Sequence, residues 1–522
     1  MKKLFSLILK PFRTNLPLFL ALWILASSAD VFYWLAHDYP AIALFRAMFG
    51  FLQCYGIVFV CGLFKGRFLK TIQILLLIFG FINMMGDTCV HAILHEDFSE
   101  EIIPMLTGTN PNESAEFIPT YVTWRMVIFV VITSLIVFAI LYFTPRIRRT
   151  PKWLSYGLTG LVPVCIVILA VAKSSDWDGI YLDKARMFAM HEPITDLSGK
   201  DLPDPDVSVD EAARPGNIVL IIGESLSRRH CSLYGYAKPT TPVMDSLFRD
   251  GRLIRFTNAT AAYVSTVEVF KQLMTTYHRG YEGKWYSYPN LINIMQKSGY
   301  RTNWISNQSN VGYENLVAAI GNLSDTTIWA GAQGLSMTAE PDECVIPHVE
   351  SILSQSAPNN FTVVHLMGQH ETYRFRYPES FNRFHESDYL NKPEHQRKNL
   401  STYDNAIVYG DSVVTRIMDL YRDEEAVVFF FPDHSIDIYD SDRSYCGHAR
   451  PTDPVSATAG SEIPFVAYPT ARFEARFPEK AAALRTAANI PFNTADLIYT
   501  VMDLAGIRFN SEVQGGGNSL LK

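Results

Sequence analysis

Carboxylate and imidazole side chains stand at the ends of two apolar runs of the sequence. The run AVVFFFPDH, 426–434, ends in Asp433 and His434, and NIVLIIGES, 217–225, ends in Glu224 and a serine. If both runs are strands of one sheet, two carboxylates and an imidazole meet at one edge, and such a set of oxygen and nitrogen ligands suits zinc. Taken singly, each motif is explained about equally well without a metal, for example with Glu224 as a helix cap. Their joint position at strand ends favours a zinc site.

A candidate nucleophile lies in the stretch TNATAAYVSTVEVFKQLMT, 257–275. Small residues lead to Ser265 and Thr266, where an amphipathic segment begins. A hydroxyl group at the start of a helix faces free backbone N–H groups, which stabilise a phosphoryl group attached to it. The same pattern is also that of an ordinary Ser/Thr helix cap, so the stretch alone does not establish a nucleophile.

Three histidines are expected near the same edge: His365, His370 and His448. His370 stands close to two arginines in GQHETYRFRYP, a combination that suits a phosphate group. His448 comes 14 residues after His434 and reaches the same edge if the intervening chain is a loop. For each histidine alone, a structural role is at least as good an explanation.

The elements that would position these residues follow from the apolar patterning. Four apolar runs end in polar residues and are predicted as buried strands: 217–225, 301–308, 361–370 and 426–434. Amphipathic helices are predicted between them, for example over 289–298 and 400–421. Strands that are apolar on both faces and alternate with helices indicate a mostly parallel sheet covered on both sides, in which ligands bind beyond the carboxyl ends of the strands.

The first third of the chain has the composition of a membrane domain. Of the 522 residues, 48% are hydrophobic and only 19% charged. Five apolar stretches precede residue 176 and each approaches the ~20 residues that cross a bilayer as a helix; they cover 16–37, 40–63, 71–93, 122–143 and 154–173. Five such stretches in succession, with none later, predict a multi-pass membrane domain that keeps its first helix as an uncleaved anchor.

The short loops predict the orientation of this domain. Lys and Arg gather in the N-terminus and in the second and fourth loops, whereas the third loop, 95–121, has none and holds six acidic residues. By the positive-inside rule the N-terminus is cytoplasmic, and the chain after the fifth helix lies outside. The expected domains are a membrane domain over 1–175, a juxtamembrane segment and Pro/Asp-rich linker over 176–216, and an exported domain over 217–522.

Charge and cysteine content set further limits. A net charge of −7 argues against a nucleic-acid partner, because a phosphate backbone requires a basic face. Cys231, Cys344 and Cys446 fall in the exported part, where one disulfide among them would be chemically allowed, and the sequence does not choose the pair.

Several motifs in matching order resemble the bacterial inner-membrane phosphoethanolamine transferases. GESLSRRHCSLYGYAKPTTP is similar to the family pattern G-E-S-x-x-R-x-x-x-S-L-Y-G-Y-x-x-x-T-T-P. The resemblance continues through STVEVFKQLMT, WISNQ, HLMGQHETYRFRYPES, YDNAIVYGDSVV, FPDH and EIPF, and TGTNPNESAEF in the outward loop resembles T-N-P-x-E-A-x-E-F. It covers about residues 105 to 465, and so both the membrane and the exported part.

The resemblance implies a five-helix transmembrane domain followed by a periplasmic α/β domain of the alkaline phosphatase/sulfatase type. It implies that Thr266 is the nucleophile and also a ligand of Zn²⁺, together with Glu224, Asp433 and His434. The residues that it implies for binding phosphate or the lipid headgroup are His370, His448, Arg228, Thr109, Asn110 and Glu113, with a second zinc as an alternative role for His370 and His448.

The chain departs from the family around its metal-binding motif. Members usually carry S-D-H-G-E, whereas this chain has Pro432 before Asp433 and Ser435-Ile436 after His434, and its next acidic residue is Asp437. Neither change removes a ligand. The loop 438–460 matches the family poorly, which weakens the assignment of His448.

The function implied is transfer of phosphoethanolamine from phosphatidylethanolamine to lipid A, a lipopolysaccharide core sugar or another envelope glycan, by a monomer in the inner membrane. Two alternatives remain. A phosphoglycerol transferase or another membrane hydrolase of the sulfatase superfamily would share the metal site, although the sulfatase motif C/S-x-P-x-R does not occur here. A membrane sensor whose outer domain binds a ligand without turnover would not need Glu224, Thr266, Asp433 and His434 together.

Overall fold

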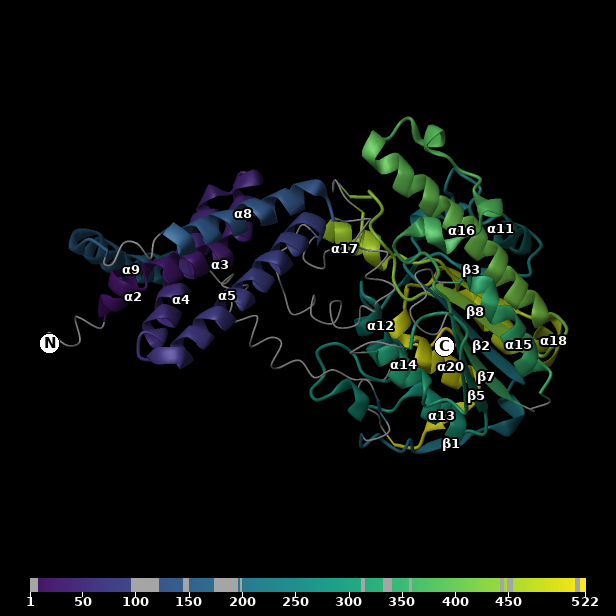
Figure 1. Ribbon diagram of the computed structural model, residues 1–522. Coiled ribbons are helices and arrows are strands. Elements are labelled where there is room, and N and C mark those ends of the chain that lie inside the picture. Colours follow the sequence, from purple (N-terminus) through teal and green to yellow (C-terminus); the bar gives the residue numbers. More distant parts are fainter. Residues whose placement is uncertain are drawn as a thin grey trace. The chain divides into compact units, whose positions relative to one another are not determined.

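The computed structural model describes two compact units of the chain (Figure 1). The described residues are 8–94, 122–143, 150–172, 196–197, 200–310, 315–331, 340–355, 359–441, 446–447, 454–511 and 517–522. The N-terminal unit is helical, and the C-terminal unit has α/β structure.

The described part of the N-terminal unit contains five helices that are long and apolar enough to span a membrane. They are α3 (Leu16–Ala36), α4 (Pro40–Cys61), α5 (Gly66–Cys89), which continues into a π-helical turn, η1 (Val90–Leu94), α8 (Trp124–Phe143) and α9 (Lys152–Ala172). A short helix, α2 (Lys10–Thr14), precedes them. The five predicted membrane stretches are therefore confirmed as helices.

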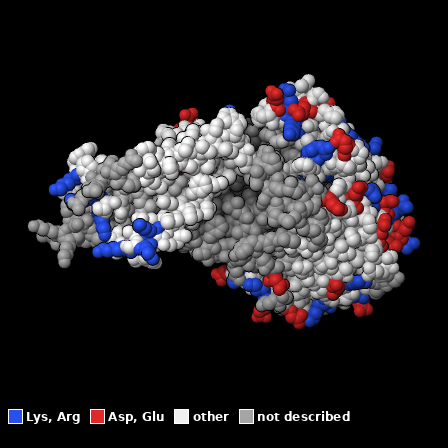
Figure 2. Space-filling view, viewed as in Figure 1, with Lys and Arg blue, Asp and Glu red and all other residues white. Residues whose placement is uncertain are grey.

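Apolar packing holds these helices together. Helix α3 packs against α4, α5 and α8, and a cluster of buried side chains including Phe12, Phe19 and Phe51 joins α2, α3 and α4. Many large apolar side chains on the outer faces are exposed, Ile82 at 60% and Phe138 at 64% for example, as expected for helices that face lipid. In Figure 2 the blue side chains of this unit gather mainly at one end, and most of its surface is uncharged.

The C-terminal unit is built on a seven-stranded sheet of order β3-β9-β8-β2-β7-β5-β6. Its strands are β2 (Asn217–Gly223), β3 (Ile254–Phe256), β5 (Arg301–Ser306), β6 (Thr326–Trp329), β7 (Asn360–His365), β8 (Ala426–Pro432) and β9 (Phe465–Pro469). Five neighbouring strands, from β8 to β6, run parallel, and β9 pairs antiparallel with β8 and β3. The predicted mostly parallel sheet is confirmed, and all four predicted strands belong to it.

Helices cover both faces of this sheet (Figure 1). One face carries α12 (Thr266–Leu273), α13 (Leu291–Lys297), α14 (Leu316–Gly321), α19 (Pro478–Thr486) and α20 (Leu497–Leu504), whose apolar side chains share a core with alternate residues of β2. The other face carries α11 (Pro242–Arg249), α15 (Ile346–Leu353) and α16 (Glu394–Leu420). Because β2 lies in the middle, all seven of its residues are buried.

The structure corrects three expectations about local structure. The helix predicted over 400–421 begins six residues earlier, at Glu394, after Pro393. Strand β7 ends at His365, so the residues from Leu366 to His370 form a loop and not the end of a strand. The segment expected as a linker contains β1 (Val207–Val209), which pairs antiparallel with β11 (Ile507–Phe509) and ties residues 200–216 to the C-terminal unit.

Candidate active site

The first two candidate ligands are brought together by the register of the central strands. Gly223 at the end of β2 is paired with Pro432 at the end of β8, so Glu224 and Asp433 are the next residues on neighbouring strands. The backbone N–H of Asp433 still donates to the carbonyl of Gly223 at 3.0 Å. Pro432, which has no backbone N–H, is tolerated here because the last position of the strand requires no hydrogen-bond donor.

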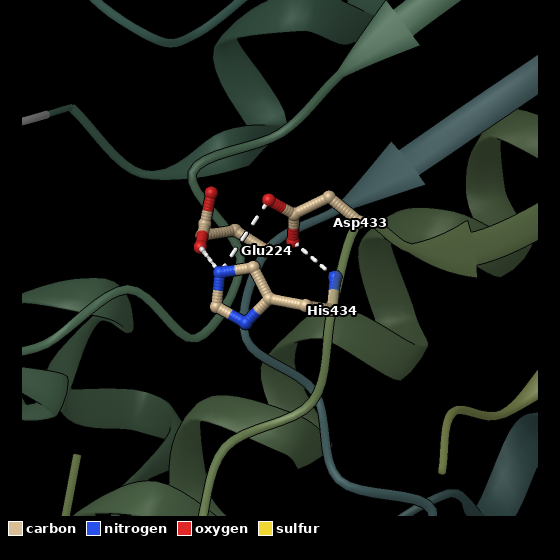
Figure 3. Close-up of side chains that lie close together, drawn as sticks. All are labelled: Glu224, Asp433 and His434. Atoms are coloured by element: carbon tan, nitrogen blue, oxygen red, sulfur yellow. Dashed lines mark hydrogen bonds and ion pairs between the residues drawn. The ribbon is translucent and has the colours of Figure 1, made fainter. Parts of the chain in front are cut away.

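Glu224, Asp433 and His434 form one buried cluster (Figure 3). One ligand atom from each lies within 4.8 Å of the others, and the exposed fractions of the residues are 1%, 0% and 0%. His434 Nε2 is 3.3 Å from Glu224 Oε1 and 3.6 Å from Asp433 Oδ2. The structure therefore assembles the three residues that the sequence placed at strand ends.

The backbone of Ser435 orients the imidazole of His434. His434 Nδ1 lies 2.7 Å from the carbonyl oxygen of Ser435. Since a carbonyl only accepts, Nδ1 carries the proton and Nε2 is left to face the two carboxylates. This is the second contact that metal-binding histidines usually make. The substitution of the usual glycine by Ser435 preserves the contact, because the backbone makes it.

Thr266 is the first residue of α12 and points into the same cluster. Its Oγ1 lies 3.4 Å from Glu224 Oε2 and 3.4 Å from His434 Nε2. The residue before it, Ser265, occupies the N-cap position but makes no capping hydrogen bond with its side chain. Helix capping alone therefore does not account for the hydroxyl pair Ser265-Thr266.

The small-residue loop before Thr266 is held by the chain between β10 (Phe492–Asn493) and α20. The N–H of Ala262 donates to Thr494 Oγ1 at 2.9 Å, and Asn493 Nδ2 donates to the carbonyl of Ala261 at 3.1 Å. Two-stranded pairing of β10 with β4 (Ala259–Thr260) adds backbone hydrogen bonds. These contacts fix the start of α12 relative to the sheet.

The loop after β7 packs directly on Glu224. Gly368 has φ +51°, and a Cβ atom there would lie 2.7 Å from the backbone nitrogen of Glu224, so only glycine fits. Asp342 accepts hydrogen bonds from the N–H groups of Met367 and Gly368, each at 2.8 Å. The buried carboxylate of Asp342 thus shapes the loop that leads to His370.

Helix α16 holds the other side of Glu224. Tyr403 Oη donates to the carbonyl of Ser225 and accepts from the N–H of Ser227, both at 2.8 Å. Ser225 has φ +55°, an unusual conformation for a residue other than glycine, and its Oγ donates to Glu224 Oε1 at 2.8 Å. Strained backbone that is held by its surroundings is common at functional sites.

Burial and mutual charge shift the acid–base properties of the cluster. Burial raises the pKa of Asp433 to about 7, and the nearby charge of Glu224 adds to this effect. Burial alone would lower the pKa of His434, but the carboxylates of Asp433 and Glu224 raise it to about 9. Burial would raise the pKa of Glu224, yet its hydrogen bond to His434 and the charge of that imidazole hold the pKa well below its usual range.

These features fit a divalent metal ion such as zinc. Two buried carboxylates converge on one imidazole, and Asp433 Oδ2 accepts no hydrogen bond from the described residues although it is fully buried. Carboxylate oxygen and imidazole nitrogen are common zinc ligands, and a cation would offset both the burial and the charge of Glu224 that raise the pKa of Asp433. Glu224, Asp433 and His434 would hold the ion, with Thr266 Oγ1 beside them.

The remaining predicted site residues have different surroundings. His370 is the last residue of the loop after β7, is partly buried, and its Nδ1 has no hydrogen-bond partner among the described residues. Arg228 donates to the carbonyl of Thr257 at 2.7 Å and forms an ion pair with Glu462 at 3.1 Å. His448, Thr109, Asn110 and Glu113 lie outside the described residues.

Arg376 has a role that the sequence did not indicate, whereas His365 has the structural role that the sequence left open for it. Arg376 is 4% exposed and donates to the carbonyl groups of His370 and Glu371, so it shapes the loop instead of offering its charge to a phosphate. His365 is fully buried beneath α12, 5.0 Å from the ring of Phe270, and burial lowers its pKa to about 4.

Sequence reasoning also missed polar groups that contact Glu224. Gln308 follows β5 and donates to Glu224 Oε2 at 3.2 Å, and Ser225 donates to the other oxygen. The polar ending of the run RTNWISNQ was the available sign for Gln308. For Asp437, the structure shows a structural role, because it accepts from the N–H of Asp440 at 3.0 Å and from Ser456 Oγ at 3.0 Å. The seven cysteines are all free, so no disulfide links Cys231, Cys344 and Cys446.

Comparison with known proteins agrees with this arrangement. The sequence model of the sulfatase family matches residues 216–507. The chain belongs to the sulfatase family. The matched range begins one residue before β2 and ends at the first residue of β11, so it contains the whole central sheet, the three residues of the cluster and Thr266.

Relatives with a similar sequence carry the name predicted from the motifs. Phosphoethanolamine transferase EptC of Escherichia coli K12 is 26% identical over an alignment of 484 positions, which covers 85% of this chain and 82% of that protein. Phosphoethanolamine transferase CptA of Salmonella typhimurium is 26% identical over 488 residues, covering 86% and 82% of the two chains. Both alignments extend over the N-terminal and the C-terminal unit of this chain.

Solved structures support the fold of each unit. The periplasmic domain of E. coli EptC, crystallised in complex with Zn, covers 61% of this chain and 90% of its own at 26% identity, with a TM-score of 0.56. The integral membrane protein lipooligosaccharide phosphoethanolamine transferase A of Neisseria meningitidis covers 95% and 96%, with a TM-score of 0.69. At 17% identity the latter shows a common fold of five apolar helices and a sulfatase domain.

Proposed function

We propose that this protein is a zinc-dependent phosphoethanolamine transferase of the bacterial inner membrane. The donor would be phosphatidylethanolamine, and the acceptor lipid A, a lipopolysaccharide core sugar or another envelope glycan. The observation that carries the proposal is the position of Thr266 Oγ1, at the start of α12 and 3.4 Å from both Glu224 Oε2 and His434 Nε2. The names of the full-length relatives support the same transferred group.

The reaction would take place in two steps on Thr266. In the first, Thr266 Oγ1 forms a bond to the phosphorus of the donor, the bond from phosphorus to diacylglycerol oxygen breaks, and the threonine proton leaves with the diacylglycerol. In the second, the oxygen of an acceptor hydroxyl bonds to phosphorus, the phosphothreonine ester breaks, and the proton of that hydroxyl passes to Thr266 Oγ1. Both steps replace one phosphate ester by another, so no oxidant or nucleotide is consumed.

Different residues of the chain would bind the metal ion, the phosphoryl group and the lipid headgroup. Zinc bound to Glu224, Asp433 and His434 would supply a positive charge that lowers the pKa of a nearby hydroxyl and stabilises a developing oxyanion. The free N–H groups at the start of α12 face the phosphoryl group on Thr266. His370 lies at the same edge, where it would contact the oxygens of the transferred group; His448, Arg228, Thr109, Asn110 and Glu113 are proposed to help bind phosphate or headgroup.

The arrangement of charge supports the proposed location. The described Lys and Arg residues of the N-terminal unit lie chiefly before α3, between α4 and α5, and at the start of α9, which places them at one end of the helices. The positive-inside rule assigns this end to the cytoplasm and the sulfatase domain to the periplasm. A membrane anchor suits the donor, which stays in the bilayer. We take the membrane domain to end near residue 175 and the catalytic domain to begin near residue 217, and expect a monomer.

The test compares Thr266→Ala with Ser265→Ala in the full chain. Donor lipid with a labelled ethanolamine headgroup is incubated with each protein, and the label is followed into the protein and into lipopolysaccharide. We expect Thr266→Ala to abolish both transfers while zinc stays bound, and Ser265→Ala to keep both. Full activity of Thr266→Ala would overturn the proposal. In a parallel incubation with phosphatidylglycerol labelled in its headgroup, transfer of label in place of ethanolamine phosphate would identify a phosphoglycerol transferase.

A further inference from the structure

Gln308 contacts a candidate metal ligand without belonging to the metal cluster itself. It lies two residues beyond the end of β5, and its Nε2 is 3.2 Å from Glu224 Oε2 and 3.1 Å from the carbonyl oxygen of Leu366. A carboxylate and a carbonyl can only accept hydrogen bonds. The amide nitrogen of Gln308, with its two hydrogens, is therefore the atom that faces both.

The backbone of Gln308 is itself held firmly. Its N–H donates to Ser306 Oγ at 3.1 Å. The preceding residue, Asn307, is 3% exposed. Its backbone N–H donates to the carbonyl of His365 at 2.9 Å, and its Nδ2 donates to Asp342 Oδ1 at 2.8 Å. Because strand β5 and the loop after β7 both anchor this turn, the side chain of Gln308 starts from a fixed point.

With Gln308 in place, each oxygen of Glu224 has its own hydrogen-bond donor. Ser225 Oγ donates to Oε1 at 2.8 Å, and Gln308 Nε2 donates to Oε2, the oxygen that also lies 3.4 Å from Thr266 Oγ1. Two donors on opposite oxygens prevent the carboxylate plane from rotating. Groups that hold metal ligands in this way commonly raise metal affinity by 10- to 100-fold.

We infer that Gln308 is a positioning residue that fixes the carboxylate of Glu224 for metal binding and keeps its Oε2 directed at Thr266. The inference rests on the proposed zinc role of Glu224. It assigns a role to a residue just after β5, a strand that supplies none of the candidate metal ligands. Gln308 would act through Glu224 and would not itself touch zinc or substrate.

The experiment measures zinc affinity, not turnover. The full chain in detergent is stripped of metal, and its zinc Kd is determined by competition with a chromogenic chelator. Gln308→Met keeps the length of the side chain but removes the donor, and we expect its zinc Kd to rise about 10- to 100-fold. The midpoint of thermal unfolding in excess zinc should stay close to that of the wild type.

Gln296→Met is the matched control. Gln296 on α13 is also half-buried, and its Nε2 likewise donates to a carbonyl, that of Leu323 at 2.9 Å, and to a carboxylate, that of Asp325 at 3.1 Å. It makes these contacts away from the metal cluster, so its zinc Kd should match the wild type. An equal loss of affinity in both variants would show general loosening of the fold and would overturn the inference.

The remaining outcomes separate this inference from the proposed function. If the wild-type chain binds zinc and Gln308→Met binds it equally well, the role of Gln308 is wrong and the proposed function stands. If the wild-type chain binds no zinc, the proposed function is wrong, and this role with it. Should Gln308→Met fail to fold, Gln308→Asn is used, because its amide is one methylene too short to reach Glu224 and the same loss is expected.

Discussion

Two buried clusters of the sulfatase domain bring a histidine against carboxylate groups, and they are built differently. Between the loop after β2 and helix α16, His230 Nδ1 lies 2.8 Å from Asp404 Oδ1, and Tyr236 Oη donates to Asp404 Oδ2 at 2.8 Å. Tyr389 donates to the same oxygen. Both oxygens of the Asp404 carboxylate have a close hydrogen-bond donor, so this cluster needs no further group. We call it the closed cluster.

In the cluster at the ends of β2 and β8, one carboxylate oxygen has no hydrogen-bond donor among the described residues. His434 Nε2 stands 3.3 Å and 3.6 Å from the carboxylates of Glu224 and Asp433, and Asp433 Oδ2 accepts no hydrogen bond from the described residues. Burying two carboxylates next to each other is costly unless a positive charge compensates them. Among the described residues, the candidate metal site is therefore distinguished by a buried carboxylate oxygen without a hydrogen-bond donor, Asp433 Oδ2, and not by a buried histidine–carboxylate pair as such.

The largest difference between the clusters should appear on removal of the histidine. We expect His434→Ala to lose tight zinc binding and to reduce phosphoethanolamine transfer by roughly three orders of magnitude or more, because a ligand and the charge it helps to hold are both lost. His230→Ala should keep its zinc, since His230 contacts Asp404 and not the ligands. Metal analysis of both purified variants checks this. Equal zinc loss in both would erase the distinction.

Substitution of the carboxylates should change stability in opposite directions. Asp404→Asn breaks a paired, fully buried carboxylate and should destabilise the folded chain by about 3 kcal/mol. Asp433→Asn removes a charge that burial and Glu224 both disfavour, so the zinc-free chain should become more stable. Thermal unfolding of both variants in the presence of a chelator measures the two effects. Destabilisation of the zinc-free chain by Asp433→Asn would contradict the comparison.

The open cluster, formed by Glu224, Asp433 and His434, should make zinc binding depend on pH. In the zinc-free chain the pKa of Asp433 is about 7 and that of His434 about 9, raised from 3.8 and 6.5, so zinc must displace protons at neutral pH. The zinc Kd should therefore decrease as pH rises from 6 to 9, by up to about tenfold per pH unit for each proton released. Competition titrations at a series of pH values measure this slope.

The same shifts determine the sign of the stability change in the zinc-free chain. Because both folded-state pKa values are raised, the stabilising contribution of these two groups is complete below their unfolded-state values and is lost as pH rises through about 7 and about 9. The wild type should therefore lose stability relative to Asp433→Asn as pH rises through 7. If the difference in stability between the wild type and Asp433→Asn did not depend on pH, the charge of Asp433 would not destabilise the zinc-free chain.

Much of the open cluster could be predicted from the sequence, because its residues follow directly from strand ends. Apolar runs locate β2 and β8, and in a parallel sheet Glu224 and Asp433 must then meet at one edge. Thr266 required the resemblance to the transferases, since its pattern is also that of an ordinary helix cap. The five membrane helices followed from length and composition alone.

The closed cluster and the supporting groups could not be predicted, because they depend on contacts between distant parts of the chain. Asp404 meets His230 across 174 residues, and Gln308 meets Glu224 across 84. Nor does the sequence reveal that Arg376 turns its guanidinium to backbone carbonyls. Side-chain hydrogen bonds of this kind have no periodicity, so they appear only once the sheet order and loop conformations are known.

The smallest expected effect tests whether the closed cluster is purely structural. Tyr236→Phe removes one neutral donor from Asp404 Oδ2, while Tyr389 and His230 still contact that carboxylate. A single hydrogen bond to a charged group contributes about 1.5 kcal/mol, and the remaining donor on this oxygen should reduce the loss to about 1 kcal/mol. The midpoint of thermal unfolding should fall slightly, with zinc Kd and transfer rate unchanged. Since Tyr236 lies on the loop that begins at Glu224, a clear rise in zinc Kd would instead show that the two clusters are coupled through residues 225–236.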